Sequence, residues 1–482
     1  MKIEFKKRLG IAIALLLFAP VVNGGAPAER NLPVPDADTI FGWLQDFTAP
    51  EHRRAGTPEH HRSVDYIAGK FREFGLEQVT KEPIEIMVWQ ARKWGLTVSG
   101  PDGPIEIPCF YQWNTAFTGP RGITAPMIYV GHDPDSWGEV AGKIVVAEAG
   151  WFPPNYFGFP EGHWFSKYFD LYRKAANRGA AGMAFIHNVP YYPGYNTNTL
   201  YFPRFDPEPG PIPMLFIARS DGERLQRLAQ AKSQATLLLD GENVPGTADN
   251  VYGILPGQSE KNIIISSHSD SPHQGIIEDG SGIASVLAQA RTWSKVPVSN
   301  RPRTLIFVAT ASHFYHCPLG SRVFAQTHQD DLMANTLMLI NIEHVAAKKA
   351  EARSGELVLT GGMSKVMVNY QGNKYLRRMM KETFKEYPPA PDYTISGLPP
   401  FSDGAGYLFT LPDLPYITFM TAPKYLLTAD DTMDKLDREW LLRANLSFAR
   451  LVESSMNLET SRFSGVKRSS LNKILWRLFS PP

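Results

Sequence analysis

Imidazole and carboxylate side chains gather in one stretch of this sequence. Six of the twelve histidines lie within residues 268–344, and acidic residues stand beside several of them. They fall into four short groups: His268-Ser-Asp270-Ser-Pro-His273, Glu278-Asp-Gly-Ser-Gly282, His313-Phe-Tyr-His316-Cys317 and Asn341-Ile-Glu343-His344. Imidazoles with carboxylates, and almost no cysteine, are the ligand set of a catalytic Zn²⁺ or a similar ion. The composition of these groups therefore predicts a catalytic metal site.

Each histidine also has an ordinary structural explanation, because a single imidazole is more often hydrogen-bonded in a core than bound to a metal. The convergence of several groups argues for a site as a whole, though not for each member. In His268-Ser-Asp270 a carboxylate two residues on can orient the imidazole as a partner behind the metal ligand.

The elements that must position these groups are alternating strands and helices. Strands are predicted at 262–267, 303–310, 336–342 and 416–420. A helix is predicted after each of the first two strands, and two more helices are predicted at 374–387 and near 439–455. Such alternation predicts an α/β fold with a mixed, mostly parallel sheet sandwiched by helices. Ligands of such sheets bind at the carboxyl ends of the strands, which is where the His and Glu groups stand.

The residues before this region have a different pattern of predicted helices and strands. Residues 36–76 have helical amphipathic spacing interrupted by a loop at 54–58, and 83–130 is dominated by short strands. Residues 120–243 indicate a separate β-rich module. Its strands are predicted at 127–130, 144–147, 183–187, 212–218 and 235–240, with helices at 174–179 and 221–231. Seventeen aromatic residues within 151–205 either pack beneath Pro-rich loops or form an aromatic wall over a substrate cleft.

Two runs carry a resemblance to a known family. Ile-Ile-Ile-Ser-Ser-His-Ser-Asp at 263–270 and Glu-Asp-Gly-Ser-Gly-Ile-Ala at 278–284 resemble the co-catalytic zinc aminopeptidase family, which includes secreted bacterial aminopeptidases and glutamate carboxypeptidase. Shorter matches follow at 307–310, 319–321 and 431–437. The β-rich module resembles the protease-associated domain inserted in many members. The resemblance implies a zinc aminopeptidase-like catalytic domain at 26–119 and 246–460, interrupted by a protease-associated domain at 120–245.

The family holds two metal ions with a His, a bridging Asp, a Glu, an Asp and a final His, and a second Glu serves as general base. Carried over by position, the resemblance makes His268 the first ligand, with Asp270 as its orienting carboxylate. It places Glu278 at the bridging position and Glu343 at the later acidic position. His268, Glu278 and Glu343 are therefore the implied ligands of one zinc ion.

The chain departs from the family at the second metal. Where the family has its Glu-Glu pair, this sequence has His313 and the residues that follow it, and Leu427 stands at the final His position. The departures predict one zinc ion and no second one. His313 stands nearest the strand end that carries the family's base, so we expect it to take the proton. His273, His316 and His344 are candidates for additional ligands.

The function favoured by this pattern is an aminopeptidase-like metallopeptidase, a hydrolase of amide bonds. A water activated by the ion would attack the carbonyl of a small peptide or amide, with an apolar or aromatic end facing the aromatic module. A catalytically inactive binding protein on the same scaffold, as in the transferrin receptor ectodomain, is the alternative. Cyclisation, as in the single-zinc glutaminyl cyclases, fits poorly because those enzymes keep the final His and the acidic pair.

Composition and the two ends of the chain bear on partners and location. A net charge of +1 over 482 residues and the lack of a basic stripe argue against nucleic acid. Residues 1–25 have the basic start, short apolar core and small residues of a Sec-type signal peptide, which predicts a periplasmic or secreted protein. The basic tail at 461–482 is either solvated or in weak contact with an anionic membrane surface. Cys109 and Cys317 are expected to be free thiols, although one disulfide is permitted.

Overall fold

Most of the predicted strands and helices are present, but residues 77–100 form one long strand where short strands were predicted over 83–130, and the strand predicted at 235–240 extends over 234–255. The computed structural model describes residues 31–100, 102–131, 137–149, 168–187, 209–314, 319–353, 356–397 and 402–466. Its helices are α1 (Ala37–Phe47), α2 (Pro58–Glu73), α3 (Tyr168–Asn177), α4 (Arg219–Gln230), α5 (Ser281–Ser294), α6 (Gly320–Thr327), α7 (Lys374–Glu386), α8 (Ala405–Thr410) and α9 (Arg438–Asn457). Its strands are β1 (Glu77–Gly100), β2 (Gly103–Ile107), β3 (Phe110–Tyr111), β4 (Ile123–Gly131), β5 (Ile144–Ala149), β6 (Gly182–His187), β7 (Met214–Ala218), β8 (Gln234–Leu255), β9 (Asn262–His268), β10 (Thr304–Thr310), β11 (Thr336–Ile342), β12 (Lys348–Arg353), β13 (Glu356–Met363), β14 (Val366–Gln371), β15 (Tyr393–Ser396) and β16 (Tyr416–Met420).

The sheet that carries the candidate site runs in the order β15-β14-β16-β11-β9-β10-β8. Strands β16, β11, β9 and β10 are parallel, whereas β8 runs antiparallel to β10, and β14 runs antiparallel to β16 and parallel to β15. The predicted α/β fold with a mixed, mostly parallel sheet is therefore confirmed. The parallel register aligns Thr310 with His268, so the carboxyl ends of β9 and β10 finish side by side.

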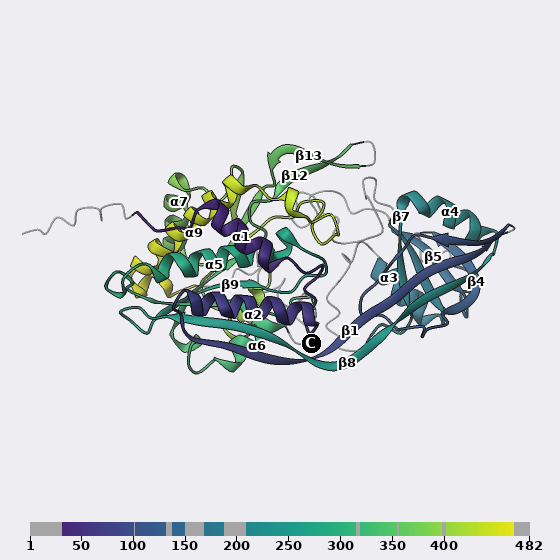
Figure 1. Ribbon diagram of the computed structural model, residues 1–482, viewed down its shortest axis with the longest axis horizontal. Helices are drawn as coiled ribbons and strands as arrows, with labels where there is room; N and C mark the ends of the chain where they lie inside the picture. The colour runs from purple at the N-terminus through teal and green to yellow at the C-terminus, as the bar shows by residue number, and fades with distance from the viewer. Residues whose placement is uncertain are drawn as a thin grey trace, which may run out of the picture. The chain divides into compact units, whose positions relative to one another are not determined.

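Helices cover both faces of this sheet (Figure 1). Ile306 packs in a core cluster with Phe324 of α6 and Tyr407 of α8. The next residue, Phe307, points the other way and lies 6.4 Å from the ring of Phe71 in α2. Because side chains alternate along a strand, the nearly continuous apolar run of β10 buries both of its faces, as expected for a strand between two helical layers.

Local signals fix the start of the two N-terminal helices. The carboxylate of Asp36 accepts a hydrogen bond from the amide of Thr39 at 2.8 Å and caps α1. Thr57 caps α2 in the same way through the amide of His60, and Pro58 occupies the first turn, where a missing N–H costs nothing. The loop between α1 and α2, residues 49–56, reaches the candidate site.

The chain between two long strands, β1 and β8, forms the strands that continue the sheet beyond β8. β1 and β8 pair antiparallel from Glu77 with Ile254 to Val98 with Ala235 and run side by side in Figure 1. The chain between them forms the sheet β4-β5-β6-β7-β3, with α3 and α4. The β-rich composition predicted for this region is present. Strand β3 pairs with β7, so this sheet takes in residues upstream of position 120.

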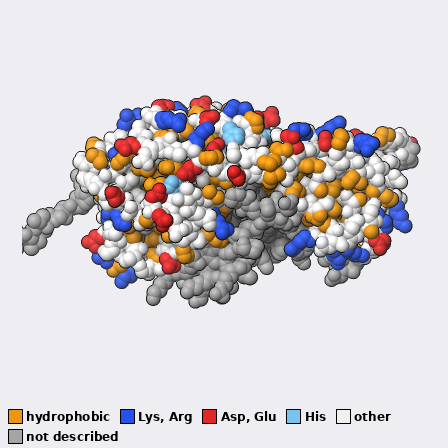
Figure 2. All heavy atoms as spheres, turned by 90° about the horizontal axis from the view of Figure 1, so that it is seen from below, with side chains coloured by type: hydrophobic (Ala, Val, Ile, Leu, Met, Phe, Trp, Pro, Cys, Tyr) orange, Lys and Arg blue, Asp and Glu red, His pale blue; other side chains and the backbone are white. Residues whose placement is uncertain are grey.

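The described part of the face drawn in Figure 2 carries no charge of one dominant sign. On the face drawn in Figure 2, basic and acidic side chains are interspersed over the described residues. Among the described helices, none combines the length and apolar character needed to cross a bilayer. Cys109 is a free, buried thiol, and burial raises its pKa to about 12. Residues 1–25, Cys317, most of the aromatic stretch 151–205 and the tail beyond residue 466 lie outside the described residues.

Candidate metal centre

Three adjacent strand ends deliver the chemistry-bearing side chains to one place. His268 is the last residue of β9, Glu343 and His344 follow β11, and His313 follows β10 by three residues. Glu278 arrives from the turn at Ile276–Gly280, which opens α5. The parallel strands end at the same edge of the sheet, so residues far apart in the chain become neighbours.

Two buried histidines face the same carboxylate. The Nε2 atom of His268 lies 3.1 Å from one oxygen of Glu278, and the Nε2 atom of His344 lies 2.8 Å from the other. Both imidazoles are at most 3% exposed. Neither Nε2 has the alignment of a hydrogen bond with any partner among the described residues.

The other nitrogen of each ring is anchored to the main chain. His268 Nδ1 lies 3.0 Å from the carbonyl oxygen of Asp270, and His344 Nδ1 lies 2.6 Å from that of Thr421. A carbonyl oxygen can only accept, so each Nδ1 carries the proton and donates it. When such a ring gives up its second proton to a metal ion, its lone pair is on Nε2, which faces Glu278, and this is the usual arrangement of metal-binding histidines.

Glu343 completes the group. One of its oxygens accepts hydrogen bonds from the side-chain amide of Asn341 at 2.7 Å and the main-chain amide of Asp403 at 2.9 Å. One ligand atom from each of His268, Glu343 and His344 lies within 4.8 Å of the others. The structure thus brings together the three ligands expected from the sequence, and His344 with them.

His313 lies at the solvent side of the group. Its ring stacks on that of His268 with centroids 4.1 Å apart, and its side chain is 19% exposed. Its Nδ1 lies 3.4 Å from a carboxylate oxygen of Asp403, whose other oxygen accepts from the hydroxyl of Thr310 at 2.6 Å. Sequence reasoning missed Asp403 because it stands in the loop before α8, where no spacing or motif connects it with β10.

Asp270 differs from its expected role. Its carboxylate lies 3.8 Å from His268 Nδ1, and the main-chain carbonyl of the same residue accepts the imidazole proton instead. The carboxylate oxygens accept hydrogen bonds from the amides of His313 and Phe314, at 3.0 and 3.1 Å. Asp270 therefore orients His268 through its backbone and fixes the turn that carries His313 through its side chain.

Two further buried acids support the turn at Glu278, and sequence reasoning assigned neither a role. Asp431 accepts from the amides of Ile277 and Glu278, and Asp279 accepts from the amide of His344 at 3.0 Å. Burial raises the pKa of Asp279 and of Asp431 to about 7. Two features of the sequence could have pointed to these acids: Asp279 is adjacent to Glu278, and Asp431 begins the run 431–437.

A buried arginine organises the loop between the first two ligands. Arg53 donates to the carbonyl oxygens of Ser269, Gly275 and Glu278 at 3.1, 3.2 and 3.3 Å. It binds the main chain and leaves the Glu278 carboxylate to the imidazoles. Gly275 has a φ of +56°, and a Cβ there would lie 2.0 Å from the Glu278 carbonyl, so this loop requires glycine.

The balance of charge suits a cation. Six buried carboxylates surround the group, namely Asp270, Glu278, Asp279, Glu343, Asp403 and Asp431. Burial alone would raise the pKa of Glu278, but His344 and His268 outweigh it and hold that pKa well below its usual range. Burial would lower the pKa of His344, and Glu278 outweighs it and raises that pKa to about 9. A divalent ion would compete with the protons on these ligands.

The remaining candidate ligands do not join the group. His273 stands apart, with its ring 5.7 Å from that of Phe110 and with Arg54 and His52 as its charged neighbours. His316 lies outside the described residues. Leu427, at the position of the family's final His, is buried and apolar. Among the described residues, two overlapping groups of possible ligands share His268, one with Glu278 and His313 and the other with Glu343 and His344.

The sequence of this region matches a described family. Peptidase family M28 matches residues 250–452, which span every ligand of the candidate group. Residues 250–452 are a peptidase family M28 domain. Its recognition from the motifs at 263–270 and 278–284 is thus confirmed.

Curated relatives of this chain carry aminopeptidase names. The probable lipoprotein aminopeptidase LpqL of Mycobacterium tuberculosis is 27% identical over 354 residues, covering 68% of this chain and 63% of the relative. The probable leucine aminopeptidase 2 of Aspergillus oryzae is 28% identical over 315 residues, covering 61% and 58%. The chain thus spans about three fifths of the length of these relatives.

Solved structures share the fold. BSAP, a zinc aminopeptidase from Bacillus subtilis, superposes with a TM-score of 0.68 at 19% identity, covering 91% of this chain and all of that one. A peptidase M28 precursor from Shewanella amazonensis superposes with a TM-score of 0.66 at 18% identity, covering 88% and 96%. At this level of identity the likeness concerns the fold of the M28 domain.

Proposed function

We propose that this protein is an exported, zinc-dependent, aminopeptidase-like hydrolase of amide bonds that works with a single ion. One observation carries the proposal. Two buried imidazoles have their Nδ1 protons fixed on main-chain carbonyls, and both place Nε2 within 3.1 Å of the Glu278 carboxylate. Metal-binding histidines are held in this way, with one ring nitrogen on a main-chain carbonyl and the other facing the ion.

The donor set fits zinc. His268, Glu278, Glu343 and His344 offer two nitrogens and carboxylate oxygens, which are the donors of catalytic zinc sites. His344 adds a second imidazole to the ion that His268 would bind, whereas Leu427 stands at a ligand position of the family's other ion. The proposal of one ion rests on this compact set and on the apolar side chain at the second site.

The chain's own residues have distinct tasks in this proposal. A zinc ion would supply Lewis-acid chemistry, activating water and polarising the substrate carbonyl. His313, the more exposed imidazole beside His268, takes the proton from water and returns it to the leaving amine. Asp403 positions that ring through its Nδ1.

Export and substrate belong to the same proposal. The signal-like composition of residues 1–25 and the lipoprotein name of the Mycobacterium tuberculosis relative support export to the periplasm or the medium. Aminopeptidase names among the relatives support a small peptide or amide substrate. The aromatic residues within 151–205 favour an apolar or aromatic end of that substrate.

Metal analysis and activity together test the proposal. Purified protein should contain about one zinc per chain, because one ligand set is complete. It should also hydrolyse aminoacyl anilides. His268→Ala should lose both, and His61→Ala, a partly exposed histidine of α2 paired with Asp249, should lose neither. A folded wild-type protein that binds no zinc would contradict the enzyme and favour a binding role for the scaffold.

A further inference from the structure

A group of basic and hydroxyl side chains lies near the metal centre without an acidic partner. It consists of His52 and Arg54 in the loop between α1 and α2, His273 in the loop between β9 and Glu278, and Tyr111 in β3. We propose that this group, the carboxylate subsite, binds the carboxylate of a peptide substrate. The identity of the ligand as a peptide rests on the proposed function.

Arg54 provides the charge of the subsite. Its Nε donates to the carbonyl oxygen of Pro272 at 3.1 Å, and its guanidinium carbon lies 5.4 Å from the centroid of the Tyr111 ring. Among the described residues it forms no ion pair. The guanidinium also acts on the Tyr111 hydroxyl, whose pKa it lowers against the larger effect of burial, and its fork of donors matches a carboxylate.

The groups around Arg54 have unused polar atoms. The Tyr111 hydroxyl is fully buried, and neither it nor His273 Nε2 has a hydrogen-bond partner among the described residues. His52 accepts from the amide of Arg54 through Nδ1 at 3.4 Å, which leaves its Nε2 as the donor. A buried polar atom without a partner is costly, so a ligand that pairs with these atoms is stabilised.

The electrostatic surroundings favour an anion. Burial, and then the positive charge of Arg54 and His52, lower the pKa of His273 to about 3. The nearest acid to His52 is Glu59, which already pairs with Arg62 at 3.0 Å. A carboxylate entering this group would meet a fixed positive charge and neutral donors in a partly buried place, where ion pairs are stronger than in water.

The subsite and the metal centre are fixed by one loop. Residues 269–277 join His268 to Glu278. Arg53, the neighbour of Arg54 in the chain, donates hydrogen bonds to two carbonyl oxygens of this loop. Ser271 and Arg53 also exchange two main-chain hydrogen bonds, of 3.0 and 3.1 Å. Pro272, the anchor of Arg54, follows His268 by four residues, and four residues span at most about 14 Å. The anchor of Arg54 therefore lies within the span of a short peptide from His268.

The subsite gives the substrate class a definite form. A short peptide would place its scissile amide at the metal centre and its own C-terminal carboxylate against Arg54. An acidic side chain beside the scissile bond offers the same chemistry. Three probes separate the two sources: Leu-Ala, its C-terminal amide Leu-Ala-NH₂, and Leu-Asp-NH₂, whose only carboxylate is on a side chain.

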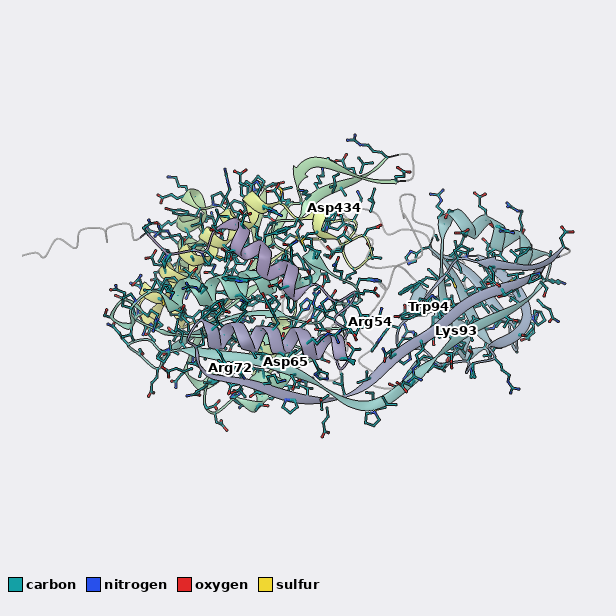
Figure 3. The ribbon with its side chains drawn as sticks, in the orientation of Figure 1. Arg54, Asp65, Arg72, Lys93, Trp94 and Asp434 are labelled. Carbon is teal, nitrogen blue, oxygen red and sulfur yellow. The ribbon has the colours of Figure 1, made fainter. Side chains whose placement is uncertain are left out.

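Calorimetric binding to full-length, EDTA-treated protein tests the subsite without relying on zinc or turnover. Leu-Ala should bind at least about tenfold tighter than Leu-Ala-NH₂, the scale of one good charge-assisted pair. Arg54→Gln should bring this ratio close to one. The control Arg72→Gln, on an exposed arginine at the far end of α2 in Figure 3, should leave it unchanged.

A milder variant guards against loss of folding. Tyr111→Phe removes only the hydroxyl, and it should lower the ratio about threefold, as expected for one hydrogen bond. Tight binding of Leu-Asp-NH₂ but not Leu-Ala would assign the subsite to an acidic side chain. Equal affinity of wild-type protein for all three probes, or a ratio that Arg54→Gln does not change, would overturn the subsite while leaving the zinc content and amidase assays of the proposed function to stand by themselves.

Discussion

His344 lies 2.8 Å from Glu278 through its Nε2, although 66 positions separate the two residues in the chain. The contact exists because β11 and β9 are parallel neighbours and end together. It places a second imidazole beside His268, in one group of possible ligands with Glu343.

His344→Gln should weaken zinc binding by at least about a hundredfold, since removing even an outer partner of a zinc ligand costs ten to a hundredfold. Competition with a chromophoric chelator measures this affinity. His328→Gln, a histidine bonded to Glu82 on the other side of β8, serves as the matched control and should bind zinc as wild type does. Unchanged affinity in His344→Gln would remove His344 from the ligand set.

His313→Ala should lower kcat for an aminoacyl anilide by about 10²- to 10⁴-fold, the usual contribution of a general base. Its zinc content should stay at the wild-type level. His313 only stacks on His268, and the group of His268, Glu343 and His344 remains in the variant. Asp403→Asn should cost roughly tenfold and shift the pH profile, as expected for a positioning residue. Loss of zinc in His313→Ala would make it a ligand instead of a base.

Arg53→Leu should destabilise the fold by at least about 3 kcal/mol, because several buried carbonyl oxygens lose their donor at once. Urea unfolding followed by tryptophan fluorescence measures the change. The exposed ion pair of Arg62 with Glu59 offers the comparison, and Arg62→Ala should change stability by less than about 0.5 kcal/mol. Similar losses in both variants would contradict the role assigned to Arg53.

The pH dependence of stability should reveal His328. Burial alone would lower the pKa of His328, but hydrogen bonds to Glu82 and Asp331 outweigh it and raise the pKa above 6.5. A raised pKa in the folded state means that the protonated ring stabilises the protein fully below pH 6.5 and loses this effect as the pH rises through the folded value. Wild type should therefore exceed His328→Gln in unfolding free energy by more at pH 6 than at pH 8.5. A difference independent of pH would show that only packing is lost.

The sequence predicted the α/β alternation because each strand of the site is an apolar run, whereas the apolar residues of the helices recur at helical spacing. It also placed His268 and Glu343 at strand ends, since a parallel sheet gathers its carboxyl ends at one edge. It could not reveal Asp403 or the bond between Asp270 and the amides of His313 and Phe314. Those contacts depend on how loops fold across the sheet edge, which no periodicity records.

The residue types and the strand order were enough to determine that imidazoles and carboxylates would meet at one edge of a sheet. The tertiary structure alone decided the state of each ring, because the main-chain carbonyls of Asp270 and Thr421 fix both Nδ1 protons. It also brought Arg54, His273 and Tyr111 together from three separate segments. Hydrogen-bond geometry is a property of atoms placed within a few ångströms, and chain spacing does not specify it.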